Sequence, residues 1–349
     1  MISLLFLLPC CLAFIVDGFQ QPVLGLSPLS LSSPCLFLSS SSSSETDKGT
    51  TSEFGALPVK QGTVQVSRGD DDDDDDDEHF NLSYNLVRPM SLSSQQAAPI
   101  VVLHGGPSVP SNYCFPLAKH VPYRSILFYD QLGCGKSDEP TNMEHYSIGQ
   151  AVDDLEVVLK QLSIRRFHLY GQSFGGILAF EYLKRCAEQG NDSNNEDDDE
   201  GCLSVILSST PTNVRQVEEE AQRLIEALPD PELFRETHQC RTPEMPEPLA
   251  NAYASAGTVW RGTTAIQDYF AQPPTNDDEG GKNISIMPSA LVLRGEYDFV
   301  TEDCSKDWKK LFNSRSIRER TLQDCSHHGL HENGLLYGDI VDSFFSEYD

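Results

Sequence analysis

The chain has 349 residues, and its 53 Asp and Glu against 25 Lys and Arg give a formal net charge of −28. This balance argues against DNA or RNA as a partner, because a phosphate backbone would be repelled. The length allows one large α/β domain with an insertion, or two smaller domains.

The N-terminal segment differs in composition from the rest of the chain. Residues 4–16 form a short apolar run, which is typical of a signal-peptide core and too short to span a bilayer comfortably. A Ser-, Leu- and Pro-rich segment follows, with six serines at 39–44 and the first lysine at Lys48. We expect residues 1–55 to lie outside the fold and to direct the chain into the secretory pathway, with no membrane span left after their removal. The protein is then either secreted or sent to a complex plastid of an alga, whose two-part presequences this pattern resembles.

Two acidic runs carry much of the charge. Residues 70–78 are nine consecutive Asp or Glu, and residues 188–200 contain seven more without a base. We expect both to be solvated, disordered loops. The first run lacks the turn glycine and spaced ligands of a calcium loop, and the ten cysteines have no C-x-x-C spacing. No metal or cofactor is therefore predicted.

From residue 79 the pattern is that of a globular α/β domain. Residues 80–87 alternate as a half-exposed strand, and residues 151–162 have the spacing of an amphipathic helix. Continuous apolar runs predict buried strands at residues 99–103, 125–129, 167–170, 203–207 and 289–293. Buried strands that alternate with helices predict a mainly parallel sheet flanked by helices on both faces.

About eighty residues without a strand run separate the last two of these strands, and residues 218–228 have helical spacing. We therefore expect a helical cap at 213–285, inserted into a core formed by residues 56–212 and 286–349. Such a cap would cover the reactive end of the sheet and exclude water.

A glycine-flanked serine follows the strand at 167–170. The motif Gly171-Gln172-Ser173-Phe174-Gly175-Gly176 lies between that strand and an apolar helical segment. This arrangement pushes a serine hydroxyl out of the sheet edge above a helix N-terminus. Asp298 and His327 each follow a later strand, in the chain order of the α/β-hydrolase fold.

The three residues predict acyl transfer. Ser173 would be the nucleophile, His327 the base and Asp298 the acid that orients His327. The backbone N–H of Phe174, with that of Gly105 or Gly106, would bind the oxyanion. His328 is the rival base.

Several motifs together are similar to those of the proline iminopeptidases, which are serine aminopeptidases of the α/β-hydrolase superfamily. The resemblance covers roughly residues 80–346, and its motifs are His104-Gly105-Gly106-Pro107, residues 129–137, the Ser173 motif, residues 295–298 and residues 324–327. It implies an enzyme that releases an N-terminal residue, preferentially proline, from a peptide or small amide or ester substrate without a metal.

Two positions depart from the family's pattern. Ser108 stands where the family has a glycine, which is tolerable if its backbone φ is not positive. In one branch of the family, acidic residues hold the substrate's ammonium, and the corresponding positions are Asp268 in the cap and Phe299 after the triad Asp. Trp260 is expected to line an apolar proline pocket or to pack the cap on the core.

Two alternatives stay open, and Phe299, which offers no acid for an ammonium, motivates only the first of them. One is a carboxylesterase or amidase that acts on substrates without a free N-terminus. The other is a non-catalytic binding protein built on the same fold, against which the intact triad argues. The oligomeric state is not indicated by the sequence.

Overall fold

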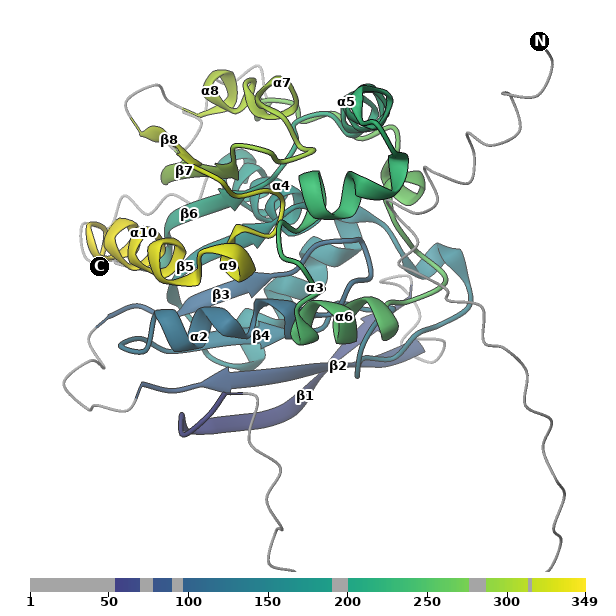
Figure 1. Cartoon of the computed structure of the whole chain (residues 1–349). Helices are drawn as coiled ribbons and strands as arrows, with labels where there is room; N and C mark the ends of the chain where they lie inside the picture. The colour runs from purple at the N-terminus through teal and green to yellow at the C-terminus, as the bar shows by residue number, and fades with distance from the viewer. Residues whose placement is uncertain (1–53, 70–77, 90–96, 190–199, 276–286, 313–315) are drawn as a thin grey trace, which may run out of the picture.

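An eight-stranded sheet forms the centre of the molecule. The computed structural model describes residues 54–69, 78–89, 97–189, 200–275, 287–312 and 316–349 (Figure 1). The strand order is β1-β2-β4-β3-β5-β6-β7-β8. The strands are β1 (Val59–Arg68), β2 (Glu78–Val87), β3 (Ile100–Leu103), β4 (Ile126–Tyr129), β5 (Arg166–Gln172), β6 (Gly201–Ser208), β7 (Ser289–Gly295) and β8 (Ile317–Leu322). The pairs from β4 to β8 are parallel, while β1 and β2 are antiparallel to their neighbours. The predicted α/β-hydrolase fold is thereby confirmed.

Alternate residues of each central strand enter two separate cores. Val101 and Leu103 of β3 pack with the helices on one face of the sheet, whereas Ile100 and Val102 pack with those on the other. The first face is covered by α3 (Ile148–Gln161) and α4 (Phe174–Glu188), and the second by α2 (Pro116–His120) and α10 (Gly334–Ser346) (Figure 1). A parallel sheet buried on both faces explains the continuous apolar runs.

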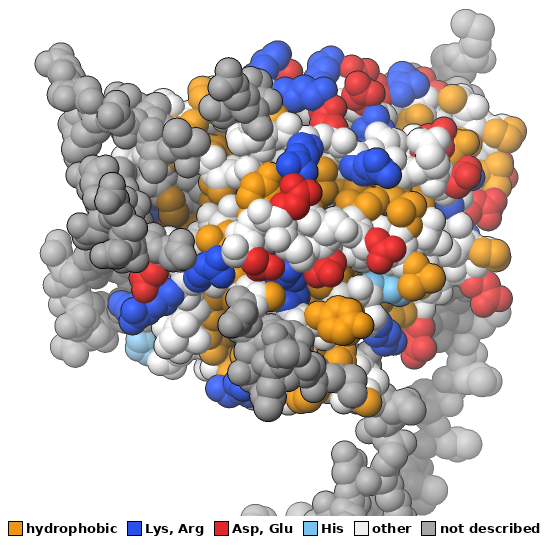
Figure 2. All heavy atoms as spheres, turned by 90° about the vertical axis from the view of Figure 1, so that its left-hand side faces the viewer, with side chains coloured by type: hydrophobic (Ala, Val, Ile, Leu, Met, Phe, Trp, Pro, Cys, Tyr) orange, Lys and Arg blue, Asp and Glu red, His pale blue; other side chains and the backbone are white. Residues whose placement is uncertain are grey.

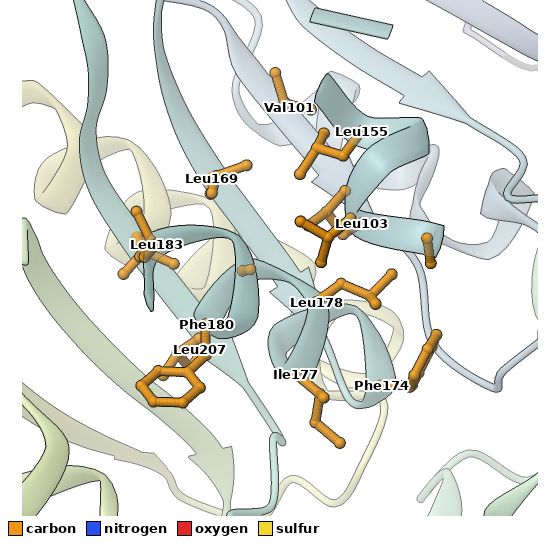
Figure 3. Packing of buried hydrophobic residues seen from close by; sticks show 14 of the residues in the cluster. Val101, Leu103, Leu155, Leu169, Phe174, Ile177, Leu178, Phe180, Leu183 and Leu207 are labelled. Atoms are coloured by element: carbon orange, nitrogen blue, oxygen red, sulfur yellow. The ribbon is translucent and has the colours of Figure 1, made fainter. Parts of the chain in front are cut away.

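Helix α4 has the most extensive apolar contacts with the sheet. Leu178, Phe180 and Leu183 are buried against residues such as Leu169 and Leu207 of the strands (Figure 3). Each fully buried side chain of this kind contributes about 1.5–3 kcal/mol. The start of α4 is consequently held in place by many contacts at once.

The strand β1 is absent from the sequence-based prediction. Its sequence is mostly polar, and only Val64 and Val66 are fully buried. An edge strand needs to bury only one face, so its apolar signal is weak. The predicted start of the core at residue 56 is also too late, because Phe54 is buried against Phe115 and Phe128.

The described part of the predicted cap contains helices joined by loops and no strand, with a single bridge between Asn213 and Phe270. Its helical segments are α5 (Val214–Ala227), η4 (Pro231–Leu233), the π-helix η5 (Arg235–Gln239), α6 (Glu247–Ala254) and η6 (Thr263–Ile266). After the cap come β7, the short helices α7 (Glu302–Ser305) and α8 (Trp308–Leu311), β8 and α9 (Gly329–Glu332).

Several predictions concern residues outside the described ranges. These are the presequence up to residue 53, the acidic residues 70–77 and most of the run at 188–200.

On the face that lies to the left in Figure 1, acidic and basic side chains are interspersed with apolar ones (Figure 2). No helix in the described part is long and apolar enough to cross a membrane.

Asp349 belongs to a buried polar cluster that lies at the opposite edge of the sheet from Ser173. The Asp349 carboxylate accepts hydrogen bonds from Arg124 Nη2 at 2.9 Å and from the Ala98 N–H at 2.9 Å, and lies 3.1 Å from His168 Nε2. Arg124 and His168 are buried, and burial lowers the pKa of His168 to about 4. The carboxylate therefore compensates a buried guanidinium beside a neutral imidazole.

We expect Asp349→Ala to lower the free energy of unfolding by about 3 kcal/mol, because it leaves the Arg124 charge buried without its main partner. Chemical denaturation measures the change. Asp342→Ala is the matched control: Asp342 pairs with the same guanidinium at 3.3 Å but is more exposed, so its loss should cost less than 1 kcal/mol. Equal effects of the two substitutions would contradict this account.

Candidate active site

A strained turn carries Ser173. The residue follows β5 and precedes α4 with φ 54° and ψ −119°, and its side chain makes no capping hydrogen bond to the helix. A non-glycine residue in this region stores about 1–3 kcal/mol of strain and persists only where its surroundings over-determine it. The packing of α4 provides that constraint, together with a 2.8 Å hydrogen bond from the Ser173 N–H to the Ser208 carbonyl.

Two glycines of the motif are required by close approach. A Cβ on Gly171 would lie 2.5 Å from the Gly175 carbonyl oxygen, and one on Gly175 would overlap the Leu103 carbonyl. Gly171 thus allows helix α4 to approach strand β5, and Gly175 allows the same helix to approach the end of β3.

Asp298 and His327 are hydrogen-bonded to each other. They follow the carboxyl ends of β7 and β8, and the His327 Nδ1–Asp298 Oδ1 distance is 2.8 Å. Asp298 Oδ1 also accepts from the Val300 N–H at 2.9 Å, and both partners are buried. Because a carboxylate accepts from Nδ1–H, the Nε2 atom of a neutral His327 is left as a base.

The rival base, His328, is engaged elsewhere. Its Nε2 lies 3.0 Å from the Tyr253 hydroxyl, which accepts a hydrogen bond from Gln239 Nε2 at 2.7 Å. Burial first, and then the neighbouring His327 and His331, hold the pKa of His328 well below its usual value. The structure thus pairs His327, and not His328, with Asp298.

One of the two glycines predicted as oxyanion donors in the loop after β3 is engaged elsewhere. The Gly105 N–H donates to the Tyr113 hydroxyl at 2.7 Å, so Gly105 is not available to an oxyanion. Gly106 lines the pocket that holds Ser173, as does Phe174, whose N–H is the first of α4 and has no partner within the helix. Of the two predicted alternatives, the structure therefore retains Gly106 and removes Gly105.

His104 fixes this loop. The Gln131 N–H donates to His104 Nε2 at 2.9 Å, so Nδ1 carries the proton that is donated to the Gly105 carbonyl at 3.0 Å. Burial lowers the pKa of His104, which favours this neutral form. Both ring nitrogens are occupied, so His104 orients the loop and is not a second base.

Ser173 and His327 line one pocket between core and cap that is partly open to solvent. The cap contributes apolar side chains from α5 and η6, and the core contributes apolar side chains from α4 and the loop after β7. These residues are Val214, Val217, Ala221, Ile266, Phe174, Ile177, Phe299 and Val300. Polar groups from Tyr113, Gln172, Gln239 and Tyr253 complete the wall. The arrangement suits an apolar acyl group next to a nucleophile.

Comparisons with known proteins agree with this geometry. The model of the family described as alpha/beta hydrolase fold matches residues 98–231. A proline iminopeptidase from Lactobacillus helveticus is 39% identical over 279 residues, which cover 72% of this chain and 90% of that protein. One from Lactobacillus delbrueckii subsp. bulgaricus is 35% identical over 285 residues, covering 72% and 91%. The chain belongs to the proline iminopeptidase family.

A solved structure has the same fold. The proline iminopeptidase of Mycobacterium smegmatis superposes with a TM-score of 0.61 at 22% identity, covering 83% of this chain and 98% of that one. As a member of the proline iminopeptidase family, the protein is a serine hydrolase of the prolyl aminopeptidase type. In the described part of the chain, no three His, Cys, Asp or Glu side chains are placed to hold a metal ion.

Ser108, which replaces the glycine of the proline iminopeptidase pattern, does have a positive φ of 70°. Ser108 therefore has the positive φ that disfavours a serine, and its hydrogen bonds to the cap offset the resulting backbone strain. Ser108 is buried, its hydroxyl donates to the Trp260 carbonyl, and its own carbonyl accepts from the Gly257 N–H at 2.9 Å. These bonds fasten the loop after β3 to the cap.

The structure brings only one of the three predicted substrate-binding residues into the pocket. Phe299 stacks on the His327 ring with centroids 4.1 Å apart. Asp268 is instead on the outside of the cap, where its side chain is 79% exposed and pairs with Arg215 at 2.6 Å. Trp260 is buried against the Phe174 ring and packs cap on core without lining the pocket.

Sequence reasoning missed Glu218. It lines the pocket from α5 and is the one acidic side chain among the described lining residues, which include no Lys or Arg. Val214 and Ala221 line the same pocket four positions before and three positions after it. Helical spacing places Glu218 on the same side of α5 as Val214 and Ala221, but only the packed cap shows that this side faces the pocket.

Proposed function

We propose that the enzyme releases an N-terminal residue, preferentially proline, from peptides by acyl transfer through Ser173. The observation that carries this proposal is the 2.8 Å bond between His327 Nδ1 and Asp298, with His327 and Ser173 lining the same pocket. Membership of the proline iminopeptidase family supports the peptidase reaction.

The proposed mechanism has two steps. Ser173 Oγ attacks the carbonyl of the first residue while His327 Nε2 takes the hydroxyl proton, and the N–H groups of Gly106 and Phe174 stabilise the oxyanion. The C–N bond breaks as His327 gives the proton to the leaving amine, which leaves an acyl-enzyme. Water then attacks the ester, His327 takes its proton, and this proton returns to Ser173 as the amino acid departs. Asp298 stays ionised throughout and stabilises the imidazolium.

Glu218 supplies the charge that a free N-terminus requires. An ammonium that enters an apolar pocket without an acidic partner loses hydration at a large cost. Glu218 lines the pocket from α5 beside the apolar Val214 and Ala221, and we assign to its carboxylate the contact with the substrate's ammonium. Pro211, Val214 and Ile266 line the same pocket and would contact the pyrrolidine ring.

We expect Glu218→Gln to lower kcat/KM for a proline arylamide by about 10- to 100-fold, mainly through KM, because a charge-assisted contact contributes about 1.5–3 kcal/mol. Steady-state hydrolysis measures this. Glu219→Gln is the matched control, since Glu219 is the next residue of α5 and is exposed. If both variants kept wild-type KM, Glu218 would not hold the ammonium.

Phe299 favours a second candidate function. Its ring covers His327 at the position where one branch of the family has an acid, which makes this wall of the pocket apolar. A carboxylesterase or amidase for acyl groups without an amine would suit such a wall. Hydrolysis of a butyryl arylester at least as fast as that of a proline arylester would support this second candidate, since the two esters share one leaving group.

We also propose, on the basis of its sequence, that the segment preceding Phe54 directs the chain into the secretory pathway and is removed, whereas Phe54 stays as part of the core. Sequencing the N-terminus of the mature protein tests this. An intact Met1 in the mature protein would contradict it.

A further inference from the structure

One short segment of the cap is hydrogen-bonded to the two loops that carry Asp298 and His327. It comprises residues 238–241 and begins within the π-helix η5. The His238 carbonyl accepts a hydrogen bond from the His327 N–H at 3.3 Å, and the Gln239 carbonyl accepts one from the His328 N–H at 3.2 Å. The cap and the His327 loop thus run side by side through main-chain bonds.

The His238 side chain reaches the other loop. Its Nδ1 lies 2.8 Å from the carbonyl oxygen of Tyr297, the residue before Asp298. A carbonyl only accepts, so Nδ1 carries the proton in this bond. Burial lowers the pKa of His238, so the imidazole is neutral at neutral pH and keeps one donor for Tyr297.

Further bonds make the two loops and the segment one unit. The Tyr297 N–H donates to the Cys325 carbonyl at 2.8 Å and joins the Asp298 and His327 loops directly. Arg241 donates from Nε to the Asp324 carbonyl at 3.1 Å and places its guanidinium 3.9 Å from the centre of the Tyr297 ring. Glu332 accepts from the Arg241 N–H at 2.8 Å and from the Ser326 hydroxyl at 2.5 Å.

We propose that His238 is a positioning residue that aligns the His327–Asp298 pair from the cap. Its carbonyl holds the main chain of His327, and its imidazole holds the main chain next to Asp298. One cap residue therefore bonds the main chain at or beside each partner of the 2.8 Å His327–Asp298 bond. The proposal rests on the triad proposed above. It implies that His327 is aligned as a base only when residues 238–241 of the cap are docked on the core.

The effect of His238 should be on kcat rather than KM. His238 is not among the residues that line the pocket, whereas Ser173 and His327 are. A reacting group that is misplaced by about 1 Å can lose about 100-fold in rate. Removal of the imidazole should therefore slow the chemical step and leave binding of the substrate almost unchanged.

The experiment compares His238→Ala, His238→Asn and Glu236→Ala in the full chain. We expect His238→Ala to lower kcat up to about 100-fold with KM unchanged. Asn presents an amide N–H where the imidazole has Nδ1–H, so His238→Asn should restore most of kcat. Glu236 belongs to the same π-helix, but its partly exposed side chain pairs only loosely with Arg235, at 3.5 Å, so Glu236→Ala should match the wild type.

A second readout needs no assumption about the substrate. The rate at which a fluorophosphonate labels Ser173 depends on the alignment of Ser173 with His327, and it should fall in His238→Ala in parallel with kcat. Wild-type labelling and kcat in His238→Ala would overturn the proposal, and so would equal impairment of the Ala and Asn variants. A wild type that is labelled but does not hydrolyse proline arylamides would contradict the proposed substrate and leave the labelling comparison valid.

Discussion

Replacing Ser173 by alanine is expected to lower kcat for a proline arylamide by about 10⁶-fold, since loss of the nucleophile removes the whole covalent route. Only binding and the oxyanion donors would remain. The strained turn should survive, because its conformation is imposed by the packing of α4 against the sheet. Circular dichroism and the denaturation midpoint of the variant should therefore resemble those of the wild type.

Ser163 provides a matched control for the Ser173 prediction. It is another serine with a positive φ, of 55°, but it lies on the surface at the end of α3. Ser163→Ala should retain full kcat, which separates the chemical role of Ser173 from any effect of alanine in the left-handed region. Substantial turnover by Ser173→Ala would mean that another residue is the nucleophile.

Replacing Asp298 by asparagine is expected to lower kcat by about 10⁴-fold with little change in KM. The asparagine amide can donate to His327 Nδ1, which would move the proton to Nε2 and leave no base facing Ser173. The Val300 N–H donates to the same Oδ1 atom that accepts from His327, so an amide nitrogen that faces His327 would also lose the bond to Val300. Steady-state kinetics near neutral pH measure the loss.

Asp303→Asn is the control for the Asp298 prediction. Asp303 lies five residues beyond Asp298, is exposed and pairs with Lys306 at 2.8 Å. It should be replaceable with no loss of kcat. If Asp303→Asn were the impaired variant and Asp298→Asn retained activity, the triad acid would have been assigned to the wrong residue after β7.

The sequence was sufficient for the fold and for the grouping of the triad residues. Ser173 is marked by glycines that only a tight strand-to-helix turn requires, and Asp298 and His327 each follow a strand of the same parallel sheet. Parallel strands bring their carboxyl ends to one edge, so local patterns were enough to place these groups together. The polar edge strand β1 gave no comparable signal.

The substrate-binding residues could not be predicted in the same way. Their positions depend on how the cap packs on the core, and cap helices follow no repeating pattern that fixes which side faces the site. Asp268 aligned with a family position but lies outside the pocket, while Glu218 lies inside it. Likewise, only the three-dimensional contact of Tyr113 with Gly105 decides between the two glycines of the oxyanion loop.

The central claim is that this pocket receives a free N-terminal proline beside Ser173. The most direct measurement compares kcat/KM of the wild-type enzyme for a proline arylamide and for the same substrate acetylated on its nitrogen. Acetylation removes the ammonium that Glu218 would hold and adds bulk at the same end of the substrate. The account predicts that the free substrate is preferred by at least about tenfold, the effect of one lost charge-assisted contact. Equal rates, or faster hydrolysis of the acetylated substrate, would contradict it.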